Sequence, residues 1–112
     1  MSTQLPTDDN GHPIPALRFV LAGAHVLTVG AGSARLGPFD PKTRVISLYA
    51  TVPVFLATGD GTVSASGSDH FFPAGTYYHA SLGGDLMGRG RHTHLAAVRA
   101  DGDGHLYLSE KE

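Results

Sequence analysis

The chain of 112 residues contains no cysteine and no tryptophan, and charged residues make up 16% of it. The absence of cysteine excludes a disulfide framework, a thiolate metal site and a cysteine nucleophile. The charged share is well below the typical ~25%, and a helical bundle normally needs more surface charge than this. The eight lysines and arginines are spread singly over a chain with a formal net charge of -2, so no basic patch for nucleic acid is expected.

Long apolar runs are also missing. No stretch approaches the ~20 apolar residues that a membrane-spanning helix requires. The first ten residues have neither the positive region nor the apolar region of a signal peptide. We therefore expect no membrane partner, and synthesis and retention in a cytosol-like compartment.

Glycine, in contrast, is plentiful, with 15 residues in the chain. Turn signals recur about every 8–12 residues, and no window sustains a helical period. This pattern predicts an all-β fold: a small antiparallel β-sandwich or barrel, jelly-roll-like, of roughly eight short strands. At this length the prediction is one domain, residues 16–112, preceded by an extended N-terminal arm, residues 1–15.

The arm is predicted from its prolines, Pro6, Pro13 and Pro15, and from Gly11, which leave little to bury. Two interpretations stay open for it. It is either a frayed tail or an arm that becomes ordered against a neighbouring subunit.

The first strand is indicated from Leu17 onward. Leu17, Phe19 and Leu21 share one face and Arg18 lies on the other, which predicts a half-buried strand. After Gly23, a second alternating stretch places Leu27 and Val29 together on one face.

The clearest alternation lies in residues 44–58. Pro53 has no N–H to give to a central ladder, so this run is expected to bend there or to lie at an edge. The sequence Gly59-Asp60-Gly61 then predicts a tight reversal into a short strand over 62–66. Six apolar residues of the run share one face: Ile46, Leu48, Ala50, Val52, Val54 and Leu56.

Later strands are predicted over 76–82, 93–100 and 105–109, the last two joined by a hairpin at residues 101–104. Aspartates in such glycine-rich positions usually bond their own backbone, so we assign them to turns rather than to an acid/base pair. They are Asp60, Asp69, Asp85, Asp101 and Asp103. No Gly-x-Ser-x-Gly elbow with the context of a hydrolase is present. We expect a protein that is not an enzyme and has no cofactor.

Histidine is the one enriched functional residue type, with seven copies. His92 and His94 would point to the same face of a strand, as two imidazoles do in a cupin metal site. A third ligand a few residues downstream is missing, because the next carboxylate is Asp101. A cupin-like metal-binding enzyme built on this pair is therefore kept as an alternative.

Aromatic residues cluster around the turn at Pro73. Because adjacent strand residues point to opposite faces, at least one member of each aromatic pair should lie outside the core. The open interpretations are packing under a loop, a subunit contact, in which Tyr and Phe are enriched, and a face that binds carbohydrate. The candidate interface residues are Phe71, Phe72, Tyr77 and Tyr78, with Arg89 and Arg91 from the glycine-rich loop nearby.

Two motifs carry a resemblance that covers residues 44–110. Residues 69–75 read Asp-His-Phe-Phe-Pro-Ala-Gly, and residues 97–110 read Ala-Val-Arg-Ala-Asp-Gly-Asp-Gly-His-Leu-Tyr-Leu-Ser-Glu. In this order they resemble small virion structural proteins of tailed bacteriophages and prophages. The loop with His92 and His94 departs from the pattern.

The resemblance implies a small β-sandwich without catalytic residues that works as a head decoration or cement subunit. A structural component of the tail or neck is the alternative. The implied partners are virion proteins, either the major capsid protein or tail and neck neighbours, and a homo-oligomer is expected. The implied location is the virion, with the bacterial host cytoplasm during assembly. The segments expected to make contact are the arm and the loops 30–41 and 83–92.

Overall fold

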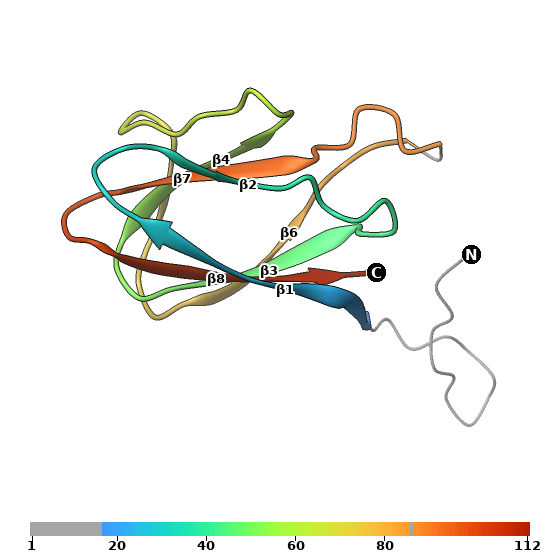
Figure 1. The fold of residues 1–112 in the computed structure, drawn as a ribbon, viewed down its shortest axis with the longest axis horizontal. Helices are drawn as coiled ribbons and strands as arrows, with labels where there is room; N and C mark the ends of the chain where they lie inside the picture. The colour runs from blue at the N-terminus through green and yellow to red at the C-terminus, as the bar shows by residue number, and fades with distance from the viewer. Residues whose placement is uncertain (1–16, 86) are drawn as a thin grey trace.

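The computed structural model describes residues 17–85 and 87–112, which form two stacked antiparallel sheets and no helix (Figure 1). One sheet has the strand order β1-β8-β3-β6 and the other has the order β2-β7-β4-β5. Eight strands wound between two sheets in this order make a jelly roll, so the predicted all-β sandwich is confirmed. The predicted arm, residues 1–15, lies outside the described residues. The strands are β1 Phe19–Val29, β2 Ala34–Leu36, β3 Val45–Ala50, β4 Val54–Gly59, β5 His70–Phe72, β6 Tyr77–Ser81, β7 His94–Arg99 and β8 Gly104–Lys111.

Strand β1 corrects the predicted burial at its start. Leu21 is 95% exposed and Phe19 is 73% exposed, whereas Val20 is buried. The pairing of β1 with β8 is irregular between Phe19 and Ala24, where Ala22 adopts a positive φ of 61°. An irregularity of this kind moves the side chains that follow to the opposite face. Beyond it Leu27 and Val29 are buried together, as predicted.

The long alternating run of residues 44–58 bends, as Pro53 predicted. It forms β3 in one sheet and β4 in the other, and the chain crosses between the sheets at residues 51–53. The shared face stays buried in both strands, because Ile46 and Leu48 point inward from one sheet and Val54 and Leu56 from the other. The alternating apolar residues of this one run therefore contribute side chains to the core from both sheets.

The strand predicted over 62–66 is wrong. These residues form a turn and a coil that pack on the outside of the second sheet, where Ala65 lies against Ala96 and Val98. Val63 and Ala65 lie against the sheet, whereas Ser64 between them is exposed. The short strand β2, which had no prediction, pairs with β7 instead.

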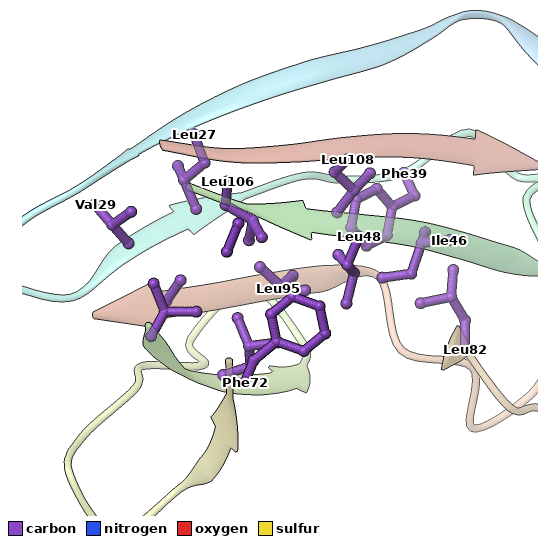
Figure 2. Packing of buried hydrophobic residues seen from close by; sticks show 14 residues of the cluster. Leu27, Val29, Phe39, Ile46, Leu48, Phe72, Leu82, Leu95, Leu106 and Leu108 are labelled. Atoms are coloured by element: carbon purple, nitrogen blue, oxygen red, sulfur yellow. The ribbon is translucent and has the colours of Figure 1, made fainter. Parts of the chain in front are cut away.

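The main core fills the space between the two sheets (Figure 2). Its fully enclosed members include Ile46, Leu95 and Leu106, which come from three different strands. Buried Phe39 adds the loop between β2 and β3 to the same cluster. Burial of these side chains is the main favourable term for the fold, at ~25 cal/mol per Å² of apolar surface removed from water.

A buried carboxylate ties the loop between β2 and β3 to the first sheet. Glu110 of β8 has a side chain that is 5% exposed, and its Oε1 accepts hydrogen bonds from the Asp40 amide at 2.7 Å and the Thr43 hydroxyl at 2.6 Å. Its Oε2 lies 2.5 Å from Nε2 of His25 on β1. Gly23 leaves room for the group, since a Cβ at that position would come within 2.8 Å of the Glu110 Cβ. We call this group the Glu110 hub.

Candidate interaction surfaces

Three tyrosines and one valine form a single row across the outer face of the first sheet. Val26 is paired with Tyr107, Tyr107 with Tyr49, and Tyr49 with Tyr77, so the row spans all four strands. The four residues are between 40% and 57% exposed. Exposed apolar side chains that lie side by side make this part of the sheet a candidate contact surface. We call these four residues the tyrosine face.

A cation lies at one side of the tyrosine face. The Lys111 Nζ is 3.1 Å from the Tyr77 hydroxyl and 3.0 Å from Nε2 of His79, and it sits 5.1 Å from the centre of the Phe19 ring. Hydrogen bonds from Ser47 and Lys111 lower the pKa of the Tyr77 phenol. The long Lys111 side chain thus lies flat over the sheet and leaves the aromatic row accessible beside it.

The other candidate residues of the aromatic cluster line a groove between the two sheets. The groove has a volume of about 440 Å³ and opens between β5 and β6, the edge strands of the two sheets. Phe72 and Tyr78 meet in it from opposite sheets, with ring centres 6.3 Å apart and an edge-on geometry. Its floor reaches the core residues Leu48, Leu56 and Leu95. We call it the edge groove.

The aromatic pairs divide as the strand alternation predicted. Phe72 is buried and Phe71 is 58% exposed, packed on Phe55 with ring centres 5.7 Å apart. Tyr77 belongs to the tyrosine face and Tyr78 to the edge groove. The four aromatic residues among the six predicted interface residues therefore lie on two different surfaces.

Two of the segments predicted to make contacts gather at one end of the sandwich. The Arg91 guanidinium donates to the Asp40 and Thr43 carbonyl oxygens, so the loop after β6 is held against the loop before β3. The described chain begins beside them, since Arg18 and Glu112 exchange backbone hydrogen bonds and the Glu110 hub binds Asp40. Residues 30–33 lie elsewhere, because Gly30 contacts Arg99 at the other end of β7.

The two candidate arginines differ in role. Arg91 is half-buried and braces the two loops. Arg89 is exposed and pairs with Asp85 at 2.9 Å within its own loop. Backbone amides of Arg89 and Met87 hold the pKa of Asp85 below its usual value. Asp85 thus serves a turn, as predicted, and so does Asp60, which accepts from the Thr62 amide and hydroxyl.

The histidine pair lies at the start of β7, and each ring has a local partner. Nδ1 of His92 is 2.6 Å from the Thr58 hydroxyl, and Nδ1 of His94 is 2.8 Å from the Thr93 hydroxyl. Within residues 17–85 and 87–112, no group of three or more histidines and carboxylates is placed to hold a metal ion. In the same stretch of chain no helix is long and apolar enough to cross a membrane.

Three members of the tyrosine face had no prediction. In the run of residues 44–58, Tyr49 alternates with the apolar residues that share the buried face. This alternation indicated that Tyr49 points outward. Its alignment with Tyr107 and Val26 depends on the order β1-β8-β3-β6, and no local pattern reveals that order. The Glu110 hub was not predicted either, because its members come together only through the same strand order.

Fold and surfaces together define a small jelly-roll domain that presents an aromatic sheet face and an apolar groove to its surroundings. Comparison with models of protein families, with curated proteins and with solved structures finds no match.

Proposed function

We propose that this chain is a non-enzymatic structural protein of a bacteriophage or prophage virion, and that it acts as a head decoration or cement subunit. The observation that carries the proposal is the tyrosine face, with Tyr49, Tyr77 and Tyr107 exposed side by side in register. Tyrosine contributes large contact area at a low cost in side-chain entropy, which suits a surface that binds a preformed shell. The loops at one end of the sandwich, together with residues 1–15, form the remainder of the proposed capsid contact.

The resemblance of residues 44–110 to virion proteins supports the same conclusion. Many identical copies on one shell make weak contacts effective, because each bound copy needs no high affinity of its own when neighbours also hold it. A structural component of the tail or neck would use the same surfaces, and location in the particle separates the two proposals.

The test is the content of purified particles. We expect mass spectrometry of gradient-purified virions from the host to find the chain at a fixed ratio to the major capsid protein. Immunogold labelling should then place it on the head, whereas label on the tail or neck would favour the alternative. Particles that contain the major capsid protein but lack this chain would refute the proposal.

A second prediction concerns the tyrosine face itself. Replacing two neighbours in the row, Tyr49→Ser with Tyr107→Ser, should weaken binding to particles that lack the chain by at least about 30-fold, because central aromatic anchors each contribute ~1–2 kcal/mol or more. Co-sedimentation with such particles gives the binding curve. Unchanged binding by a folded double variant would remove the tyrosine face from the contact.

The matched control replaces an exposed tyrosine outside the row. Tyr78→Ser changes the edge groove and leaves the tyrosine face intact. At low occupancy, where bound copies have no neighbours, this variant should bind particles that lack the chain with nearly the affinity of the unchanged chain.

A further inference from the structure

The edge groove is an apolar surface that the fold itself leaves uncovered. Tyr78 pairs with Leu48, whose side chain is buried between the sheets, yet Tyr78 is 56% exposed. An inward-facing aromatic residue with this exposure means that the sandwich is not closed along this side. Within the described part of the chain, β5 and β6 have no strand beyond them, so an extended segment has room to lie along the opening.

The lining of the groove selects the chemistry of its occupant. It contains no lysine, arginine, aspartate or glutamate, and His70 is its one ionisable side chain apart from Tyr78. Phe71, Phe72 and Pro73 add apolar surface around the mouth. Aromatic grooves of this type bind proline-containing extended segments, which lose little conformational entropy on docking and need few backbone partners.

The chain carries such a segment immediately before its first described residue. Residues 10–16 read Asn-Gly-His-Pro-Ile-Pro-Ala and contain no acidic or basic residue other than His12. Pro13 and Pro15 flank Ile14, the largest apolar side chain of the segment. Proline is tolerated along the open edge of a sheet, because no N–H is required there.

Chain length decides which copy the segment reaches. Leu17 precedes β1, and β1 and β6 are opposite edges of one sheet with β8 and β3 between them. Three strand spacings amount to ~14 Å, before the chain turns around the sheet to enter the groove. Ile14 is three residues from Leu17 and reaches ~10 Å at full extension. Ile14 therefore falls short of the groove of its own copy.

We propose that the edge groove of one copy binds residues 13–15 of a second copy of this chain. The exchange of these segments would link neighbouring subunits side by side. This inference goes beyond the proposed role in the virion, because it concerns the free protein and stands or falls without particles.

The experiment places a photo-crosslinker in the arm of the full-length chain, as Ile14→p-benzoylphenylalanine. On irradiation we expect a covalent dimer in a denaturing gel, and mass spectrometry should locate the link within residues 70–78. A link within a single chain, a link to the tyrosine face, or no dimer at ~1 mM protein would each overturn the proposal, the last because even a contact with a millimolar Kd forms at that concentration.

Matched pairs of charge substitutions, each added to the crosslinker variant, test the groove. Tyr78→Glu and His70→Glu should reduce the dimer yield by at least about tenfold, because an incoming apolar segment would bury an unpaired carboxylate. Tyr107→Glu and His105→Glu make the same changes outside the groove and should leave the yield unchanged. Circular dichroism verifies that each variant is folded. If Tyr78→Glu proves to be unfolded, the test rests on His70→Glu, because His70 is exposed and its substitution should not disturb the core. Equal yields in folded groove and control variants would refute the docking site.

Discussion

Glu110→Ala is expected to lower the free energy of unfolding by about 3–4 kcal/mol, since it removes a buried charge that three groups share. The Asp40 amide and the Thr43 hydroxyl lose their acceptor, and His25 loses its carboxylate partner. A domain of this size has a total stability of roughly 6–17 kcal/mol, so the loss is a large fraction of it. The melting temperature should fall by about 13–17 °C.

Two variants accompany this measurement. Glu110→Gln keeps an oxygen for the Asp40 amide and Thr43 but no charge for His25, so about 1–2 kcal/mol should be lost. Glu112→Ala makes the same change two residues later, where the partner Arg18 has a side chain that is 51% exposed, and should cost less than about 1 kcal/mol. Urea unfolding measures all three. If Glu110→Ala matched Glu112→Ala, the hub would have no special role in stability.

Leu106→Ala should have an effect of similar size for a different reason. Leu106 is completely buried on β8 and is paired with Leu27 on one side and Ala50 on the other. Truncation leaves a cavity between the two sheets, which costs about 3–4 kcal/mol at a site that cannot collapse. Because β8 lies between β1 and β3, its neighbours are held by their own hydrogen bonds and cannot close the gap.

The next residue in the same strand is the control. Tyr107 points outward and is 48% exposed, so Tyr107→Ala should cost about 1 kcal/mol or less. The pair tests the strand alternation directly, since a one-residue shift in register would exchange the two effects. Urea midpoints for both variants provide the comparison.

Much of this architecture could be predicted, because alternation is a local signal. The buried face of residues 44–58 and the bend at Pro53 follow from period two and from the missing proline N–H. The start of β1 could not be predicted in the same way. Alternation assumes a regular ladder, and the irregularity around Ala22 exchanges the faces of Val20 and Leu21.

The candidate surfaces were predictable to a smaller extent. The pairs Phe71–Phe72 and Tyr77–Tyr78 indicated exposed aromatic side chains, because adjacent residues of a strand point to opposite faces. Their division between two surfaces depends on which sheet each strand joins, and the tyrosine face joins residues as distant in sequence as Val26 and Tyr107. Partners that are far apart in sequence leave no periodic trace.

The central place of β8 in its sheet also determines when the first sheet can form during synthesis. Strands β1 and β3 meet only through β8, whose last residue is Lys111. While the ribosome still holds β8, the first sheet cannot close, and the inward faces of β1 and β3 stay open to solvent. The first sheet can therefore form only after β8 has left the ribosome, and until then the apolar faces of β1 and β3 are exposed to aggregation.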